Sequence, residues 1–359
     1  MVVTLDAEAA RASDVAAGTS PLAELMACLH AFAEPEHHPE SRAWLAGVRE
    51  KLPDELIQQL NYHAPLWARY RCRLLFPLRA PLNRALDAEL GTLRALGLER
   101  FVRCSAIAIR GTPFATEGLG DRERQREFVR ECERRSFSRA ELARGLVHDP
   151  DSFRSGLIDV LERCAETFFA AEWRRLEPHL AEVAARVRDQ LRVEPLTTVL
   201  ASLSPSATTG PGARVSYDKL QSGNARIRQR GCLLVPTLHG WPHLMVKFQE
   251  EELPTVVHFL AGDWTRQPHV SQAMVRDRLA AIAEPARMEL CRHLIGEPIT
   301  TSELAHRTQL SEPQVSRHLR RLREVGLVTS IREGRLVYHR LHAKLLLSLG
   351  ADVLTTIMR

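Results

Sequence analysis

The sequence predicts a mainly helical (α+β) chain of two domains, and three observations lead to this fold class. Apolar residues recur at helical spacing over much of residues 20–200. A break rich in turn residues, 204–212, is followed by short β-branched runs. The C-terminal part then holds a compact pair of short helices followed by a β-hairpin. We expect an N-terminal domain over 1–265 and a C-terminal domain over 270–359, with a hinge at 262–268.

The N-terminal domain is predicted to be rich in α-helix, with one small antiparallel sheet. Ser20 and Pro21 have the pattern of a helix N-terminus, and an amphipathic helix follows them. Pro178 is expected to interrupt or restart a longer helix that precedes it. The β-rich runs that would form the sheet are 214–217, 232–235 and 255–260.

The segment 300–326 predicts two short helices joined by a tight turn. Thr300 with Glu303, and Ser311 with Gln314, each have the spacing of a capping box, in which two side chains satisfy backbone N–H groups at the start of a helix. We therefore expect the second helix of the pair to span 311–325.

This second helix has two different faces. Val315, Leu319 and Leu322 recur at helical spacing and form an apolar stripe, and Gly326 provides the left-handed residue that ends the helix. An α-helix fits the major groove of B-DNA, where Arg can bind guanine and Gln can bind adenine. In a helix-turn-helix the second helix enters that groove. The candidate DNA-binding residues on the polar face are Ser311, Gln314, Ser316, Arg317, His318, Arg320 and Arg321.

A β-hairpin is predicted directly after this helix. The runs 327–331 and 336–341 are rich in β-branched and apolar residues, and the turn between them contains a glycine. A hairpin in this position is a wing. Arg332 and Arg335 would lie at its tip, where they are further candidates for contact with DNA.

In this order of elements the chain resembles the ArsR family of bacterial winged-helix repressors. The segments that carry the resemblance are 283–287, 316–319, 322–328 and 338–341. The resemblance implies a transcriptional regulator, a repressor, that binds a near-palindrome in double-stranded DNA. It also implies a homodimer through the first and last helices of the domain, here 273–283 and 343–358; an alternative is that the apolar stripe of the last helix packs on the N-terminal domain.

The N-terminal region faintly resembles the helical domain that precedes the winged helix in some actinobacterial regulators of the ArsR type. The matching segments are 20–25 and 234–242. The resemblance implies no biochemical role for this domain, and sensing or assembly are the natural hypotheses. A small organic effector is the kind of ligand we would expect it to bind, if it binds one.

The distribution of charge favours nucleic acid as a partner. Residues 271–359 hold 14 basic and 9 acidic residues, which accounts for the whole net charge of +5, whereas the preceding 270 residues hold 35 of each sign. The basic residues are mostly Arg, whose guanidinium binds phosphate and guanine through two parallel hydrogen bonds. The asymmetry between the two halves carries this inference.

No metal site or cofactor is predicted. Metal-sensing members of the ArsR family have a Cys-x-Cys motif at the start of the helix before the turn, and 300–305 contains no cysteine. His239 and His243 are four residues apart, but Pro242 would break the helix that this spacing requires. The seven cysteines show no C-x-x-C spacing, which is typical of buried thiols in a reducing compartment.

The sequence favours a binding protein over an enzyme, because no Gly-rich phosphate loop, G-x-S-x-G or H-E-x-x-H motif occurs. The alternative hypothesis is an N-terminal ligand-binding or enzymatic domain, with the winged helix as a protein-interaction or accessory module. The aromatic segment 62–70 either lines a ligand pocket or packs inward. No apolar run is long enough to span a membrane and no signal peptide is recognisable, so we expect a cytoplasmic location.

Overall fold

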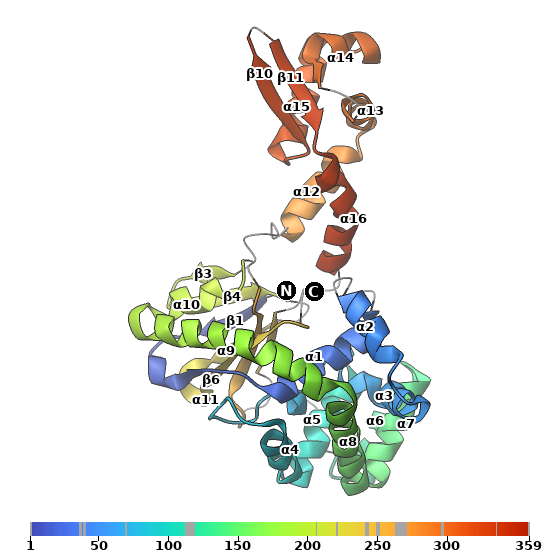
Figure 1. Ribbon diagram of the computed structural model, residues 1–359, viewed down its shortest axis with the longest axis vertical. Coiled ribbons are helices and arrows are strands. Elements are labelled where there is room, and N and C mark those ends of the chain that lie inside the picture. The colour runs from blue at the N-terminus through green and yellow to red at the C-terminus, as the bar shows by residue number, and fades with distance from the viewer. Residues whose placement is uncertain are drawn as a thin grey trace. The chain divides into compact units, whose positions relative to one another are not determined.

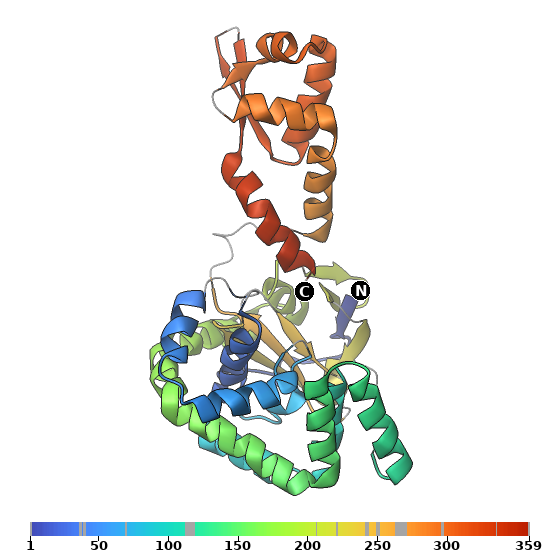
Figure 2. The same cartoon turned by 90° about the vertical axis from the view of Figure 1, so that its right-hand side faces the viewer.

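The computed structural model describes residues 2–35, 38, 41–68, 70–111, 119–205, 207–219, 222–240, 244–248, 252–262, 271–295, 298–334 and 336–357. The chain divides into two compact units, Met1–Trp264 and Thr265–Arg359 (Figures 1 and 2). The hinge expected at 262–268 lies outside the described residues, except for Gly262.

The N-terminal unit consists mainly of helices, of which α1 (Pro21–Ala33) is almost wholly buried. Ser20 caps α1 by accepting a hydrogen bond from the N–H of Ala23 at 3.2 Å, and Pro21 occupies the first turn. Every residue of α1 except Ala33 is buried, including the polar Glu24 and His30. The other helices are α2 (Arg42–Arg49), α3 (Asp54–His63), α4 (Leu86–Arg94), α5 (Leu98–Arg110), α6 (Arg122–Glu133), α7 (Phe137–His148), α8 (Pro150–Cys164), α9 (Ala170–Val193), α10 (Leu196–Ser202) and α11 (Ile227–Arg230), with 3-10 turns η1 (Ala12–Asp14), η4 (Ala64–Leu66) and η5 (Arg73–Leu75).

Among the described residues of this unit, two four-stranded sheets occur, with strand orders β3-β4-β1-β5 and β2-β6-β8-β7. The mainly helical class with small sheets is confirmed, but the single antiparallel sheet is not. The pairs β1–β5, β2–β6 and β6–β8 are parallel, so both sheets are mixed. The strands are β1 (Val2–Asp6), β2 (Val15–Ala17), β3 (Thr208–Gly210), β4 (Arg214–Asp218), β5 (Gly223–Arg226), β6 (Cys232–Thr237), β7 (Met245–Lys247) and β8 (Thr255–Leu260).

The prediction missed β1 and β2 because these strands are short and their partners are distant in the sequence. β1 pairs with β4 and β5, and β2 pairs with β6. A short apolar run does not indicate which distant segment it will join, because strand pairing depends on tertiary packing.

The helix α9 passes through Pro178 without a break, contrary to the expectation that this proline interrupts it. A five-residue π-helical turn, η6 (Ala165–Phe169), separates α9 from α8 instead. Leu176 and Leu180 on either side of Pro178 are buried, so core packing outweighs the roughly 3 kcal/mol that proline costs inside a helix. Although α9 has 24 residues, no helix among the described residues is both long and apolar enough to cross a membrane.

The C-terminal unit contains five helices and a three-stranded sheet of order β10-β11-β9 among its described residues (Figure 1). Its core is formed by α13, α14, α15 and the sheet, and includes Leu290, Leu304, Val315, Leu327 and Leu341. The elements are α12 (Gln272–Ile282), α13 (Pro285–Leu294), β9 (Ile299–Thr300), α14 (Thr301–Thr308), α15 (Glu312–Glu324), β10 (Val328–Glu333), β11 (Leu336–Leu341) and α16 (Ala343–Ile357).

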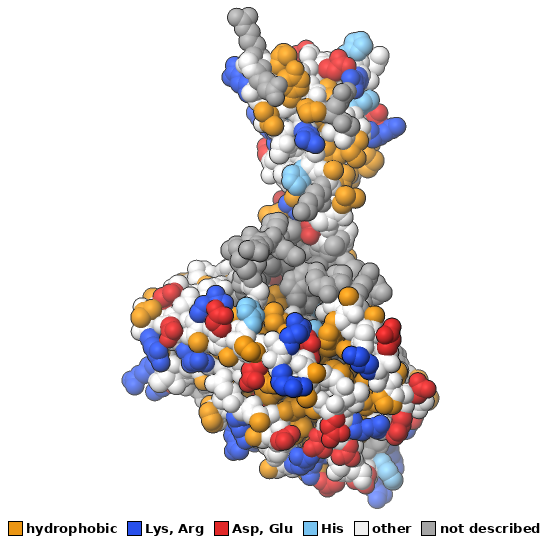
Figure 3. All heavy atoms as spheres, viewed as in Figure 1, with side chains coloured by type: hydrophobic (Ala, Val, Ile, Leu, Met, Phe, Trp, Pro, Cys, Tyr) orange, Lys and Arg blue, Asp and Glu red, His pale blue; other side chains and the backbone are white. Residues whose placement is uncertain are grey.

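The charged residues of α6 and α7 form ion pairs on the surface of the N-terminal unit. Arg110 binds Glu131 at 2.5 Å, and Arg144 binds Glu133 at 2.6 Å. Figure 3 shows acidic and basic side chains interspersed over this unit. The surface in this view is therefore one of mixed charge and does not form a continuous basic patch.

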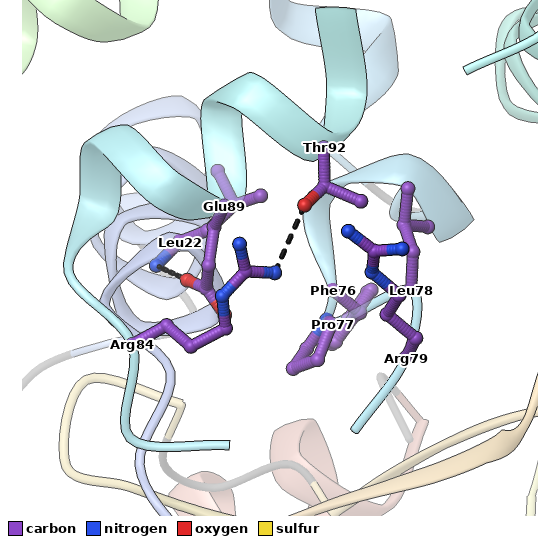
Figure 4. A pocket seen from close by; sticks show the side chains of 8 residues that line it. All are labelled: Leu22, Phe76, Pro77, Leu78, Arg79, Arg84, Glu89 and Thr92. Atoms are coloured by element: carbon purple, nitrogen blue, oxygen red, sulfur yellow. Dashed lines mark hydrogen bonds between the residues drawn. The ribbon is translucent and has the colours of Figure 1, made fainter. Parts of the chain in front are cut away.

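A small pocket of the N-terminal unit contains a buried carboxyl group, that of Glu89 on α4 (Figure 4). Glu89 accepts hydrogen bonds from the N–H of Leu22 at 2.9 Å and from the hydroxyl of Ser20 at 2.8 Å, at the start of α1. Burial raises the pKa of Glu89 to about 7, although these hydrogen bonds and the charge of Arg84 act in the opposite direction. The remaining lining residues are Phe76, Pro77, Leu78, Arg79 and Thr92.

The stability of the protein is expected to depend on the protonation of Glu89. Because its folded pKa of about 7 lies above the ordinary 4.5, the folded state binds this proton more tightly than the unfolded state. The resulting stability is fully present below pH 4.5 and is lost as the pH rises to 7, by on the order of 3 kcal/mol. Denaturant unfolding between pH 4.5 and 8 should therefore show a smaller loss of stability in Glu89→Gln than in the wild type.

Glu99→Gln is the control for this measurement, since Glu99 is an exposed carboxylate in the first turn of α5. It should keep the wild-type dependence on pH. An identical dependence in Glu89→Gln and the wild type would contradict the assignment.

Candidate nucleic-acid interface

The predicted helix pair is formed by α14 and α15. Thr300 caps α14 by accepting a hydrogen bond from the N–H of Glu303 at 3.3 Å. The helix ends at Thr308, and Gln309 takes the left-handed conformation with φ of 59°. Leu310 then packs against the core of the unit. The turn between the helices therefore consists of Gln309, whose backbone is strained, and Leu310, whose side chain packs on the core.

The start of α15 has the predicted capping box. Gln314 Oε1 accepts hydrogen bonds from the backbone N–H of Ser311 at 3.0 Å and from its hydroxyl at 2.8 Å. Pro313 lies in the first turn, where no intrahelical N–H is required. These contacts fix the direction in which the helix leaves the turn.

The end of α15 is a Schellman motif. The N–H of Gly326 binds the carbonyl of Arg323 at 2.9 Å, and the N–H of Leu327 binds the carbonyl of Leu322 at 2.9 Å. Gly326 has φ of 78°, a conformation that side chains disfavour. The glycine therefore turns the chain from the helix into the first strand of the wing.

The two faces of α15 are separated by burial as the sequence predicts. Val315, Leu319 and Leu322 are buried in the core of the unit. The opposite side carries the exposed residues Ser311, Gln314, Ser316, Arg317 and Arg320. An exposed row of cations and amide groups on a capped helix has the chemistry required for contacts with phosphates and base edges.

Three predicted residues of this helix have partners within the unit. Gln314 uses its carbonyl oxygen in the capping box, which leaves its amide N–H groups as the donors available to a ligand. His318 is 23% exposed, and its Nδ1 lies 3.6 Å from Glu284 Oε2, at the start of α13. Arg321 pairs with Glu324 at 3.2 Å. Arg317 and Arg320 are exposed, and Arg317 lies nearer the N-terminus of the helix.

The wing is the antiparallel hairpin of β10 and β11, with Gly334 at φ of 62° in its turn. Arg332 is exposed, and its Nε donates to the carbonyl of Gly334 at 3.3 Å. Arg335 lies outside the described residues. The exposed apolar residues of the hairpin are Ile331, Leu336 and Val337.

A buried histidine that sequence reasoning missed joins the wing to α14. His339 Nε2 lies 2.9 Å from the hydroxyl of Thr301, and its Nδ1 lies 2.8 Å from the hydroxyl of Ser330. Burial, assisted by the charge of Arg323, lowers the pKa of His339, which favours the neutral ring. A neutral imidazole has one nitrogen that donates and one that accepts. A hydroxyl can both donate and accept, so the two hydroxyls can satisfy both ring nitrogens. The short strand β9, which was also not predicted, pairs with β11 at this point.

A buried arginine connects α15 to the two helices predicted to form a dimer. Arg278 on α12 is 5% exposed; its Nε donates to the carbonyl of Val325 at 3.2 Å, and its NH1 lies 3.5 Å from Asp352 on α16. Helices α12 and α16 lie side by side (Figures 1 and 2). Their exposed large apolar residues are Met274, Leu279, Leu347 and Ile357.

The described residues contain no group of three side chains suited to a metal ion. His239, one of the two histidines considered above, has its Nε2 2.7 Å from Glu172 Oε1, while His243 lies outside the described residues. This contact and the pairing with Arg175 outweigh desolvation, and they lower the pKa of Glu172 to about 2. His342 accepts a hydrogen bond from the N–H of Leu345 at 3.2 Å and so caps α16. Both His239 and His342 thus have structural partners.

The fold and this surface define the class of the C-terminal unit, which is a winged helix-turn-helix domain. Residues 282–331 match a family described as helix-turn-helix domain. Residues 1–265 match a family described as a family of unknown function, DUF5937, which takes in most of the chain. The protein belongs to this DUF5937 family.

The similarity to the ArsR family predicted from the sequence is confirmed by curated relatives. The arsenic resistance transcriptional regulator ArsR1 of Pseudomonas putida is 47% identical over 57 residues, which are 16% of this chain and 44% of the relative. The nodulation protein NolR of Rhizobium meliloti is 30% identical over 73 residues, which are 20% of this chain and 60% of the relative. This chain thus spans less than two thirds of each.

A solved structure with similarity to the chain is an ArsR-like transcriptional regulator from Rhodococcus sp. RHA1. The two are 27% identical, with a TM-score of 0.22, over 23% of this chain and 76% of the other.

The left-handed conformation of Gly326 can be tested by adding one methyl group. No atom lies within 4 Å of the added Cβ position, so Gly326→Ala should destabilise the C-terminal unit through backbone strain alone, by about 1 kcal/mol. Gly156→Ala, inside α8 with equally open space, should instead stabilise its unit by about 0.5–1 kcal/mol. Calorimetric unfolding of both variants measures this difference, and an unchanged unfolding free energy in Gly326→Ala would refute the strain.

Proposed function

We propose that this protein is a DNA-binding transcriptional regulator that reads double-stranded DNA with α15 and the wing. One observation carries the proposal: α15 has a buried apolar stripe and, opposite to it, an exposed row that includes Gln314, Arg317 and Arg320. The match of residues 282–331 to a helix-turn-helix family supports it. So do two relatives that are named transcriptional regulators, ArsR1 and the HTH-type transcriptional regulator NmtR of Mycobacterium tuberculosis. In such domains the second helix enters the major groove with its N-terminal residues nearest the bases.

The position of each residue along α15 suggests its role. Ser311 and the helix N-terminus would hold a phosphate, because backbone N–H groups and the helix dipole favour an anion there. Arg317 would bind guanine through its forked donors. Gln314 must release Ser311 before it can form the two-bonded contact with adenine, since its oxygen is engaged in the capping box.

The remaining residues would contact the DNA backbone or the edge of the site. His318 would reach a base edge by turning away from Glu284, and Ser316 would flank it. The cations assigned to phosphates or to the minor groove are Arg320, Arg321, Arg332 and Arg335. Arg321 would have to exchange Glu324 for a phosphate, which is favourable because a surface ion pair contributes little.

The regulator is proposed to act as a homodimer through α12 and α16. Leu347 is 84% exposed and Ile357 is 68% exposed on α16, whereas Met274 is 40% exposed and Leu279 is 43% exposed on α12. A two-fold axis through this surface would place two copies of α15 about one helical turn of DNA apart and would select a near-palindromic operator. Repression is the mode of action proposed, because a further relative, SdpR of Bacillus subtilis, is named a transcriptional repressor.

The N-terminal unit would supply sensing or assembly, with a small organic effector as its ligand. Its size exceeds what a winged helix needs in order to bind DNA, and its family has no assigned function. We therefore propose no catalytic activity for this unit.

Loss of Arg317 should relax sequence preference, whereas loss of Arg332 should weaken all binding equally. An operator is first selected from random duplexes, and affinities for it and for a scrambled duplex are then measured by fluorescence anisotropy over a range of salt. Arg317→Ala should lose about 1–3 kcal/mol of discrimination. Arg332→Ala should reduce the slope of log affinity against log salt by about 0.9.

The control for both is Arg192→Ala, because Arg192 lies on α9 and pairs with Asp189, outside the C-terminal unit. It should bind as the wild type does. Equal losses on the operator and the scrambled duplex in Arg317→Ala would move that residue from base recognition to phosphate contact.

The dimer can be tested by placing a charge on the exposed face of α16. Leu347→Glu should shift the protein from dimer to monomer in sedimentation experiments, since burying an unpaired carboxylate costs several kcal/mol. Ile295→Glu is the matched control, because Ile295 is 64% exposed in the same unit but lies just after α13. A dimer of unchanged affinity in Leu347→Glu would exclude this surface.

A further inference from the structure

One face of β7 and β8 carries polar side chains into the helical core of the N-terminal unit. In the antiparallel pair, Met245 lies opposite His258 and Lys247 lies opposite Val256. Paired residues and alternate residues of a strand share one side of the sheet. Val256 belongs to the core formed with the helices, in which Phe76 and Cys72 also lie. Lys247 and His258 therefore face this core.

Lys247 is a buried cation without a hydrogen-bond acceptor among the described residues. It is 2% exposed, and its Nζ lies 4.3 Å from the centre of the Tyr70 ring and 5.8 Å from that of Phe76. Burial, together with the charges of Arg71 and Arg73, lowers the pKa of Lys247 to about 7. Aromatic faces compensate a desolvated ammonium only in part.

Arg71 is a second buried cation in the same place. It is 5% exposed, and among the described residues its guanidinium donates a single hydrogen bond, to the sulfur of Met245. A thioether is a weak acceptor, so within the described part of the chain most donors of this guanidinium have no matching acceptor. Burial lowers the pKa of Arg71 to about 9, although the charge of Glu34 acts in the opposite direction.

His258 and Arg73 are two further basic residues beside Lys247 and Arg71. His258 is 1% exposed, its ring centre lies 5.5 Å from that of Phe76, and its Nε2 has no hydrogen-bond partner among the described residues. Burial and the charge of Arg71 lower its pKa to about 3, so the ring is neutral and can donate one hydrogen bond. Arg73 is held by backbone carbonyls, those of Pro77 at 3.0 Å and Pro254 at 2.9 Å. Its charge adds to the positive potential.

Buried cations are normally paired, because an unpaired buried charge strongly destabilises the folded state. Here two cations and a neutral imidazole surround Phe76 and Met245, and among the described residues their donors outnumber the acceptors around them. An oxyanion supplies both the missing negative charge and several acceptor oxygens. We propose that Lys247, Arg71 and His258 form a buried binding site for a small oxyanion group, a carboxylate, phosphate or sulfate, within the N-terminal unit. This site is independent of the proposed DNA binding.

Thermal unfolding of the full chain in sulfate or inorganic phosphate tests the site, with sodium chloride used to match the ionic strength. A ligand that binds only the folded state stabilises it in a saturable manner. The wild type should gain several degrees in Tm at millimolar anion. Lys247→Met should lose this gain, and the control Lys51→Met, at an exposed position after α2, should keep it. An equal gain in Lys247→Met, or no saturable gain in the wild type with either anion, overturns the proposal.

A second variant, Arg71→Met, tests the site if Lys247→Met does not fold. Both substitutions remove a buried cation but keep an unbranched apolar side chain. Each should lose the response to sulfate, and Lys247→Met should be at least as stable as the wild type when no anion is present. A saturable wild-type response in Arg71→Met would overturn the site.

The dependence on pH gives a readout that a purely structural lysine would not change. Sulfate keeps its charge between pH 6 and 8.5, so a change in affinity reports the groups of the protein. The groups that face the site are Lys247, Arg71, Arg73, His258, Tyr70, Cys72 and Glu34. Above pH 7 Lys247 must take up a proton when the anion binds, so the affinity measured by calorimetry should fall about tenfold or more as the pH rises from 6 to 8.5. An affinity that is constant with pH contradicts the proposal.

Discussion

The burial of Val315, Leu319 and Leu322 is the constraint on which the C-terminal unit depends. These three side chains lie in the core that α13, α14 and the wing share. Because the three apolar side chains occupy one side of α15, Arg317 and Arg320 on the other side face solvent. The same burial sets the direction of the helix. The capping box at its start and the Schellman motif at its end then determine its length. Hydrophobic packing thus positions the polar face.

Side-chain hydrogen bonds at the two ends of α15 affect how this helix could contact DNA. Gln314 serves the capping box and is also a candidate for base contact, so DNA and the helix N-terminus would compete for its oxygen. Arg278 bonds to the end of α15 and lies near Asp352 of α16. A change in the pairing of α12 with α16 would therefore alter the contacts of Arg278 at the end of α15 that adjoins the wing. Such a link offers a physical route between the proposed dimer and the proposed DNA contact.

The N-terminal unit departs from the usual pattern of a helical core, because ionisable groups are buried within it. Glu89 is satisfied by donors at the start of α1, and Glu172 is matched by His239 and Arg175. Lys247 and Arg71 are different, since the described residues offer them aromatic rings and a thioether. Evolution tolerates such destabilising arrangements mainly where a ligand uses them. This contrast separates the structural polar groups from the proposed site.

The sequence by itself determined the local features of the C-terminal unit: the ends of α15, its two faces and the hairpin that follows. These features depend on neighbours three or four residues apart, such as Ser311 with Gln314, or on the intrinsic conformation of Gly326. Only the tertiary structure decided which distant segments meet. The pairing of β1 with β4 and β5, the contact of His339 with Thr301 and Ser330, and the placement of Lys247 beside Tyr70 all join residues far apart in the chain or buried by other elements. No short-range pattern encodes them, because their energies arise from burial and from partners that folding brings together.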